Sequence, residues 1–405
     1  MNLRPFSTAL LAPALVLTIT TAPAGGSELD VEEVLARHVE AKGGAQAWKG
    51  VESLRWTGSY GAFGYASPFT LTRQRPARMR FDTANKDGDA WISAHDGEVT
   101  WTINPFLATP WAVEMNTVDA AVFAAETDFD GPLFDAAAKG HQVRLEGVVD
   151  FDGIDAYKIV LTRAGGGEEE WYLDKETFLE VARIAPASDF GRPIETGRTY
   201  FMDFRPVEGL MLPHRIEKEY STRFRSYDLA TVEVNPPLEA ESFQLPLSNA
   251  MAALAPLAGD WQVRMEWATR PGAPWGEAVT TASVEEAFHG GLLRMELSFV
   301  QAGQPRKIFH TWSYDRFREV YLETAFDSFS FRHSLMEGTM EDGRLVTSSI
   351  DSGTFLETRG QKIHTRRTTS GIGPDGFEVL REISTDGGES WQENLRMTFR
   401  RPADG

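Results

Sequence analysis

One stretch near the start of the chain, residues 29–44, repeats its apolar positions with the period of an α-helix. Asp30 with Glu33 three residues later forms a capping box, and Gly43 and Gly44 supply a stop signal. The expected buried stripe consists of Val31, Val34, Leu35, His38 and Val39. The pattern predicts an amphipathic helix that packs its stripe against another element.

Most of the chain that follows alternates apolar and polar residues with the period of two that is typical of β-strands. Asp96-Gly97 and Asp152-Gly153 lie between such runs and indicate tight hairpins. Strands of the first half are expected at residues 51–61, 68–75, 78–83, 90–95, 99–103, 141–149, 156–162, 169–174, 179–184, 199–206, 212–221 and 223–234. Their shortness and regular punctuation predict a meandering antiparallel sheet.

The alternation of apolar and polar residues is interrupted at two places in the first half. Residues 117–140 carry apolar bulk among alanines and acids, and they predict one or two short helices interrupted at Gly131-Pro132. A polar, proline-bearing stretch from Pro236 to Pro246 marks the end of a first domain, which we place at residues 25–245.

The second half, residues 250–402, begins with a short apolar helix or turn at 251–257 and returns to strands. They are expected at 262–269, 279–288, 292–300, 307–314, 319–325, 330–340, 344–349, 361–369, 376–384 and 393–400. About ten strands of this length close readily into a small barrel, which leaves no sheet edge exposed.

Residues 1–24 have the pattern of a signal peptide. Arg4 gives a positive beginning, an apolar run from Ala9 to Ile19 is too short to span a bilayer, and Ala22-Pro23-Ala24 supplies small residues for cleavage. We therefore expect an exported, periplasmic protein that is cleaved near Ala24 and makes no stable membrane insertion.

The composition of the chain excludes several kinds of site and partner. The absence of cysteine excludes disulfides, thiolate nucleophiles and cysteine-bound metals. The formal net charge of -19, or -20 once Arg4 is removed, repels phosphate backbones, so no nucleic-acid partner is expected.

Four segments, taken in order, resemble the LolA/LolB-like superfamily of outer-membrane lipoprotein carriers. They are VLARHVEAKGGAQAWKGVESLRWTGSY, DFDGPLFDAAAKGHQVRLEGVVDFDGIDAYKIVL, EEWYLDKETFLEVARI and YFMDFRPVEGLMLPHRIE. The resemblance covers residues 29–245. It implies an open antiparallel half-barrel whose concave apolar face is covered by helices and receives acyl chains.

Such a ligand needs little from any single residue, because each buried methylene contributes about 0.8 kcal/mol. Candidates for the cavity wall are Trp56, Phe63, Phe69, Trp91, Trp101, Phe123, Phe134, Tyr157, Trp171 and Phe204, each of which can equally be plain core. Arg78 and Arg80 flank Met79 on an expected strand, where one of them can face the cavity mouth or both can be solvated surface charges.

The segments LAGDW, WSYDRFREVYLETAFDS, EGTMEDGRLV and STDGGESW resemble a bacterial family of uncharacterised lipocalin- or nitrobindin-like barrels. A barrel interior either holds a small ligand or is filled by its own side chains. Candidates to line it are Trp261, Trp267, Phe288, Phe309, Trp312, Tyr314, Tyr321 and Phe331. The nitrobindin resemblance implies haem held by histidine, but His310, His333 and His364 match no such motif and no cofactor is expected.

The fold class predicted is mainly β: a LolA-like antiparallel half-barrel with covering helices, followed by a closed lipocalin-like barrel. The function predicted is a non-enzymatic periplasmic carrier of a hydrophobic small molecule or acyl chain. Two alternatives stay open. One is a scaffold that docks an envelope protein partner, and the other is a hydrolase that uses a carboxylate pair in a barrel cleft, although no nucleophile, phosphate-loop or dinucleotide motif is found.

Overall fold

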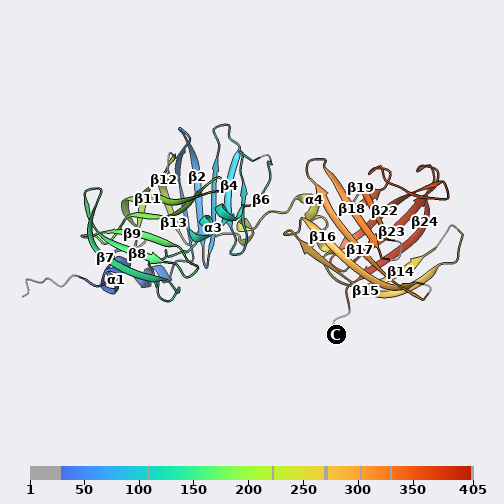
Figure 1. The fold of residues 1–405 in the computed structure, drawn as a ribbon, viewed down its shortest axis with the longest axis horizontal. Helices are drawn as coiled ribbons and strands as arrows, with labels where there is room; N and C mark the ends of the chain where they lie inside the picture. The colour runs from blue at the N-terminus through green and yellow to red at the C-terminus, as the bar shows by residue number, and fades with distance from the viewer. Residues whose placement is uncertain are drawn as a thin grey trace, which may run out of the picture. The chain divides into compact units, whose positions relative to one another are not determined.

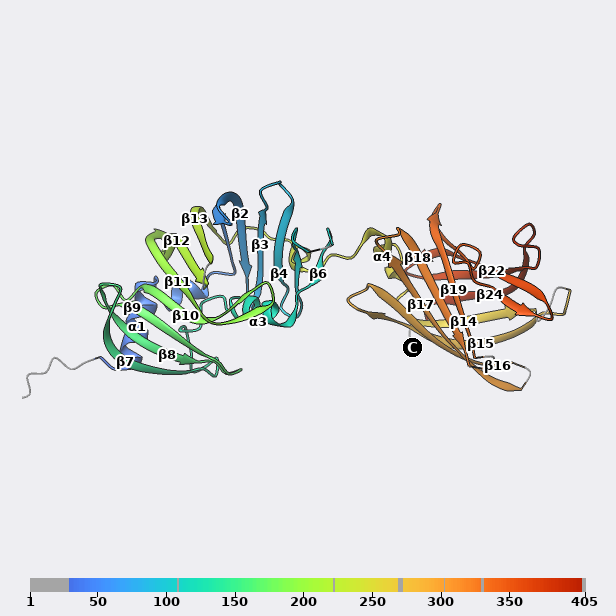
Figure 2. The same cartoon turned by 45° about the horizontal axis from the view of Figure 1, so that its top comes forward.

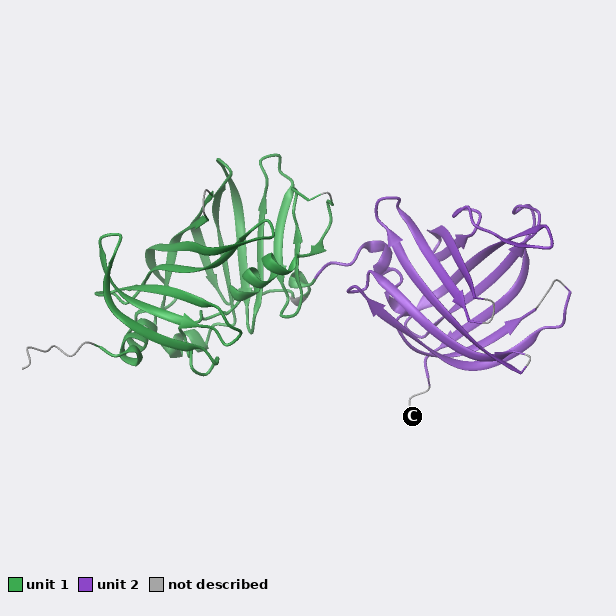
Figure 3. Cartoon of the chain, in the orientation of Figure 1, with its two compact units in different colours: residues 1–244 green, residues 245–405 purple. Residues whose placement is uncertain are grey.

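The structure of the protein, a computed structural model, describes residues 29–107, 109–220, 223–268, 272–301, 303–328 and 331–402. The expected signal peptide, residues 1–24, lies outside the described residues. The chain divides into two compact units, Met1–Gln244 and Leu245–Gly405, which are coloured separately in Figure 3.

Unit 1 is one antiparallel sheet with helices against it (Figure 1). Its helices are α1 (Val31–Ala41), α2 (Ala45–Lys49), α3 (Thr117–Ala125) and the 3-10 turn η1 (Ala240–Phe243). Its strands are β1 (Ser53–Ala62), β2 (Tyr65–Gln74), β3 (Arg78–Ala84), β4 (Ala90–His95), β5 (Thr100–Ile103), β6 (Val113–Glu114), β7 (Gln142–Phe151), β8 (Ile154–Thr162), β9 (Glu168–Asp174), β10 (Glu180–Asp189), β11 (Arg192–Val207), β12 (Leu210–Tyr220) and β13 (Arg223–Val234).

The strand order of this sheet is β6-β5-β4-β3-β2-β1-β13-β12-β11-β10-β9-β8-β7. The chain starts in the middle, meanders to the edge at β6, crosses to the opposite edge at β7, and meanders back until β13 pairs with β1. The crossing is made by residues 115–141, which include α3 and which we call the crossover segment. Because the sheet is open, this segment must pass over one of its faces, and α3 packs against β5, β10 and β11 (Figure 2).

Helix α1 begins at the predicted capping box. The Glu33 amide donates to the Asp30 carboxylate over 2.8 Å, and the Asp30 amide donates back to Glu33 over 3.2 Å. Val34 and His38 of the predicted stripe are buried, and the Nδ1 of His38 lies 2.8 Å from the Phe178 carbonyl oxygen. The helix therefore closes one end of the sheet.

Unit 2 is a closed barrel. After α4 (Asn249–Ala252) and η2 (Ala255–Leu257) come eleven strands, of which ten, β14 to β20 and β22 to β24, form a ring that β20 closes by pairing with β22. The strands are β14 (Gly259–Trp267), β15 (Gly276–Ala287), β16 (Leu292–Gln301), β17 (Gln304–Asp315), β18 (Val320–Asp327), β19 (Arg332–Glu341), β20 (Arg344–Ser348), β21 (Leu356–Thr358), β22 (Gln361–Gly373), β23 (Gly376–Ser384) and β24 (Gln392–Arg400).

The predicted fold class is confirmed in both units: an open antiparallel sheet with covering helices, then a closed antiparallel barrel. Details differ. In the region 117–140 one helix forms, and the chain after Gly131-Pro132 runs as turns. Strand β11 begins at Arg192, earlier than expected, because a hairpin with β10 extends it. Within the described residues no helix is long and apolar enough to cross a bilayer.

A close backbone approach fixes the link between α1 and the sheet. Gly43 has φ +112°, and a Cβ placed there would lie 2.3 Å from the carbonyl oxygen of Gly209, at the β11–β12 turn. Gly44 also has positive φ, +83°, but a Cβ there would meet only the flexible end of Glu40 at 3.3 Å. Replacement of Gly43 by alanine therefore tests both the backbone contact and the unusual backbone conformation. Replacement of Gly44 by alanine tests the backbone conformation alone.

We expect Gly44→Ala to cost roughly 1–3 kcal/mol of unfolding free energy, because its backbone, with φ 83° and ψ 151°, lies in a region that is essentially restricted to glycine. Gly43→Ala should cost roughly 3 kcal/mol or more, because a backbone clash is added to the same strain. Urea unfolding followed by tryptophan fluorescence measures both. Equal losses in the two variants would contradict the role given to the Gly209 contact.

Candidate functional site

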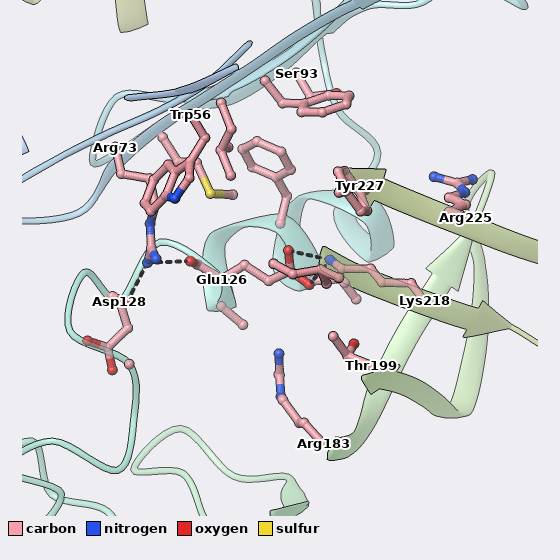
Figure 4. Close-up of a pocket in the computed structure, with 18 of the residues that line it drawn as sticks. Trp56, Arg73, Ser93, Glu126, Asp128, Arg183, Thr199, Lys218, Arg225 and Tyr227 are labelled. Carbon is pink, nitrogen blue, oxygen red and sulfur yellow. Dashed lines mark hydrogen bonds and ion pairs between the residues drawn. The ribbon is translucent and has the colours of Figure 1, made fainter. Parts of the chain in front are cut away.

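A cavity of about 470 Å³ lies in unit 1 between the sheet and the crossover segment (Figure 4). The volume falls within the roughly 300–1,000 Å³ typical of small-molecule sites. One part of its wall is aromatic and aliphatic, formed by alternate residues of β1 to β4 and β13: Leu54, Trp56, Tyr60, Phe69, Leu71, Met79, Phe81, Trp91, Tyr227 and Leu229. These side chains share one face because a strand turns every second residue to the same side.

The remaining wall is polar and charged. Its lining includes six basic side chains, Lys42, Arg73, Arg163, Arg183, Lys218 and Arg225, and six acidic ones, Glu114, Asp119, Glu126, Asp128, Asp130 and Glu180. Because the two signs are equal in number, the cavity carries no formal excess charge.

Many of these charges fasten the crossover segment to the sheet. Arg73 of β2 donates from Nη2 to the carbonyl oxygens of Glu126 and Asp128, at 2.8 and 2.5 Å. Lys218 of β12 donates to both carboxylate oxygens of Glu126, at 2.7 and 2.8 Å. Figure 4 shows these two side chains in contact in the cavity. Arg75 forms an ion pair with Asp130. Arg73 therefore satisfies two backbone carbonyls of the crossover segment, while Lys218 and Arg75 bind its carboxylates.

Two further clusters lie deeper. Glu169, which is 3% exposed, accepts hydrogen bonds from both Arg163 and Arg183. The Nζ of Lys42 donates to Glu180 over 2.7 Å, and both side chains are about nine-tenths buried. Arg183 points into the cavity in Figure 4.

The pKa values of these carboxyl groups are lowered. Burial by itself raises the pKa of Glu126, but the charges of Lys218 and Arg183 outweigh burial and the net shift is downward. The same balance, with Arg183 and Arg163 as the cations, lowers the pKa of Glu169, and Lys42 with His38 lowers that of Glu180. The three carboxyl groups are therefore ionised near neutral pH.

Three aromatic rings, those of Phe63, Phe106 and Phe190, contact the cavity-lining Trp91 and form a cluster beside the cavity that we call the aromatic rim. They stand on three separate turns, after β1, β5 and β10, and their ring centroids lie 5.6 to 6.3 Å apart. Each ring is about half exposed, and Phe190 also lines the cavity. Arg223 lies over Phe63 and Phe190, with its guanidinium 5.6 and 5.1 Å from the two centroids.

The structure places five of the expected wall residues in the cavity lining: Trp56, Phe69, Trp91, Phe123 and Trp171. Phe63 is in the rim instead. The other expected wall residues lie outside the lining and pack elsewhere: Trp101, Phe134, Tyr157 and Phe204. The Nε1 of Trp101, for example, donates to the Phe243 carbonyl oxygen over 2.8 Å, on the side of the sheet away from the cavity.

Arg78 and Arg80 do not line the cavity, which corrects the expectation for one of them. On β3 the neighbours Met79 and Phe81 face the cavity, so the alternation of the strand turns both arginines to the other face. There Arg80 binds the Asp82 carboxylate and donates to the Ser242 carbonyl oxygen. The sequence analysis missed Arg73, Glu126, Arg183 and Lys218, because their meeting depends on how the crossover segment folds back.

In unit 2 the expected ligand residues belong to the core. Trp261 and Trp312 are 1% exposed, and Trp267 and Tyr314 pack against the same apolar cluster. The Trp261 ring lies 5.1 Å from that of Phe377. Phe288 and Phe331 are each 78% exposed and Phe309 43%, so these three face outward and do not line the interior. Across the described residues no group of histidine, aspartate and glutamate has the arrangement of a metal site.

Residues 248–401, which are less than half of the chain, match the family model described as "Protein of unknown function (DUF1579)". No curated protein sequence matches the chain.

Among solved structures, a LolA superfamily protein from Nitrosomonas europaea is 14% identical, with 53% of this chain and 98% of that chain covered and a TM-score of 0.37. A putative outer membrane lipoprotein-sorting protein domain from Vibrio parahaemolyticus is 12% identical, covering 53% and 97%, with a TM-score of 0.37. The MucA/MucB complex of Pseudomonas aeruginosa gives 14% identity, 91% and 94% coverage, and a TM-score of 0.19. The fold described above rests on the strand order and barrel closure of this chain itself.

The Lys218–Glu126 contact gives a first prediction for the site. The pair is partly buried, with side chains 15% and 31% exposed, so its loss should cost more than the roughly 1 kcal/mol of a surface pair and less than the roughly 3–5 kcal/mol of a fully buried one. We expect Lys218→Met to raise local opening of residues 117–130 by about thirtyfold, or about 2 kcal/mol. Hydrogen exchange of that segment measures it.

The matched control is Arg215→Met, on the same strand but on the opposite face, where Arg215 pairs with Glu217 and is half exposed. It should leave exchange of the crossover segment nearly unchanged. Equal exchange in the two variants would show that Lys218 does not hold the segment.

A pH prediction follows from the lowered pKa values. A carboxyl group whose pKa is lower in the folded state stabilises that state above its unfolded pKa of about 4.5, and the contribution is lost as pH falls through the folded pKa. The urea midpoint of unit 1 should therefore be lower at pH 3.5 than at pH 6. Glu169→Gln should reduce this dependence, and an unchanged dependence would contradict the assignment.

Proposed function

We propose that this chain is an exported binding or carrier protein that holds a lipid or another amphiphilic small molecule in the cavity of unit 1. The observation that carries the proposal is the cavity itself: a volume of about 470 Å³ with an aromatic and aliphatic wall on the sheet side. Each methylene of a ligand buried against that wall contributes about 0.8 kcal/mol, so a hydrocarbon tail binds without any special residue.

The charged part of the lining limits the kind of headgroup that the ligand can have. Its acidic and basic side chains are equal in number, and those nearest the crossover segment already have partners. An added charged headgroup would have to compete with these ion pairs. The balance favours a neutral or zwitterionic headgroup, which can accept and donate hydrogen bonds without displacing them.

The absence of catalytic function is part of the proposal. Hydrolysis by two carboxyl groups needs one with a raised pKa to act as a general acid. In the described residues, Glu126 and Glu180 of the cavity lining and the buried Glu169 nearby are bound by cations and have lowered pKa values. Their contacts are those of groups that fasten the chain.

Native mass spectrometry of the full chain, purified without detergent and mixed with phosphatidylcholine vesicles, tests the proposal. A mass increase equal to one acyl-bearing molecule supports it. Protein that stays at its apo mass with phosphatidylcholine and also with monoacylglycerol contradicts it, and a stoichiometric protein partner without lipid would favour a scaffold instead.

A blocking variant tests the place of binding. Ser93 of β4 lines the cavity, whereas Ser59 of β1 is exposed and lies next to the cavity-lining Tyr60, so it faces the other side of the sheet. We expect Ser93→Trp to weaken binding of a dansyl-labelled monoacylglycerol at least tenfold, because the indole fills the volume. Ser59→Trp should change it by less than twofold. Fluorescence titration gives both values, and similar affinities would place the ligand elsewhere.

A further inference from the structure

The interior of the barrel in unit 2 contains a second cluster of buried charges, unrelated to the cavity of unit 1. Arg367 of β22 stands directly opposite Arg381 of β23, and Thr347 of β20 is the neighbour of Arg367 on its other side. On the same strand as Arg367, Thr369 is fully buried two residues further on. The period of two therefore turns Arg367 and Arg381 to the inner face of the barrel.

One carboxylate in the cluster is already satisfied. Glu323, which is 1% exposed, accepts hydrogen bonds from the Nε2 of His310 at 2.6 Å, from the Nη1 of Arg367 at 2.7 Å and from the Thr347 hydroxyl. Burial and the nearby Arg367 lower the pKa of His310 to about 4, so the imidazole is neutral at pH 7. Glu323 therefore balances the charge of one guanidinium group.

The other arginines of the cluster lie near Asp327 or near a neutral amide. Arg332 stands opposite Asp327 in the β18–β19 register, and Arg306 of β17 reaches the same Asp327 carboxylate at 3.4 Å. The Nε of Arg381 donates to the neutral amide oxygen of Asn394 at 3.0 Å. Arg381 thus has a neutral partner, while the guanidinium groups of Arg367 and Arg332 are close enough to lower its pKa.

Some buried hydrogen-bond donors of the cluster have no acceptor, which also indicates a binding site for an anion. The Nε of Arg367 and the hydroxyl of Thr369 have no hydrogen-bond partner in the structure, and these side chains are 5% and 0% exposed. Burial, together with Arg367 and Arg332, lowers the pKa of Arg381 to about 9. Leaving such groups unsatisfied is costly, so each orphaned donor indicates an acceptor that binds there.

Apolar side chains lie beside the cluster. Phe299 is opposite Arg306 in the β16–β17 register, and Ile308 follows Arg306 two residues later on the same face. Both are half-buried and pack on the barrel core, as does Trp267. An oxyanion at the arginines would therefore have hydrocarbon surface next to it.

We propose that the barrel of unit 2 binds an oxyanion borne on a small organic molecule, with Arg367, Arg381 and Arg332 as its ligands. The planar fork of arginine matches both carboxylate and phosphate groups, which are the two sources of this chemistry. The cluster stands in a chain with a formal charge of -19, so it does not follow from a basic composition. It is also unlike the cavity of unit 1, where acidic and basic residues balance.

Isothermal titration of the full chain carrying Ser93→Trp, which fills the cavity of unit 1, with octanoate, octyl phosphate and octanol tests the proposal. Saturable binding of octanoate or octyl phosphate supports it, and the tighter of the two identifies the headgroup. Octanol has the same tail without the charge and should bind at least tenfold more weakly. Absence of binding by both anions, or equal binding of octanol, overturns the proposal.

The variant Arg381→Gln removes one guanidinium that binds no carboxylate, so the fold should keep or raise its melting temperature while anion affinity falls at least tenfold. A purely structural Arg381 would instead lower the melting temperature and leave affinity unchanged, which would overturn the assignment. Arg294→Gln, at an exposed pair with Glu285 outside the barrel, is the matched control and should bind as the parent does. Ser93→Trp should also bind as the parent does, which separates this site from the cavity of unit 1.

Discussion

The crossover segment between β6 and β7 is the constraint on which unit 1 depends. A sheet that starts in its middle, runs to one edge and resumes at the other must return the chain across a face. The face that it crosses is the apolar one, so the segment covers hydrocarbon surface while bringing buried carbonyl groups with it. Arg73 donates to two of those carbonyl groups and Lys218 holds the carboxylate of Glu126, and the space left between segment and sheet is the cavity.

The two units use buried charge in different ways. In unit 1 each cation of the crossover contacts has a carboxylate or carbonyl partner, and removal of one partner would leave the other uncompensated. In unit 2 Arg381 has a neutral partner and stands opposite another arginine. Like charges directly opposite on neighbouring strands destabilise a sheet, so the barrel retains an arrangement that its own residues leave unbalanced.

Local patterns predicted the elements well and the site only in part. The capping box at Asp30 and the Asp96-Gly97 turn depend on neighbouring residues, so the sequence shows them directly. The inward face of a strand is harder to assign, because Met79 and its flanking arginines fit either orientation until the register is known. The ion pair of Lys218 with Glu126 joins residues 92 positions apart, and no local sequence pattern predicts such a contact.

The aromatic rim is the most weakly held group of side chains beside the cavity. The contacts among Phe63, Phe106 and Phe190 are ring contacts, each of roughly 0.5–1.5 kcal/mol, between turns that carry no strand pairing at that point. The crossover segment is held by several charge-assisted hydrogen bonds, and the central β1–β13 pairing by a ladder of backbone bonds. Because opening follows the least costly route, these ring contacts are expected to part before the crossover segment or the sheet opens. If the proposed hydrophobic ligand is bound in the cavity, the half-exposed rings are the apolar surface beside it that it can reach at the lowest cost.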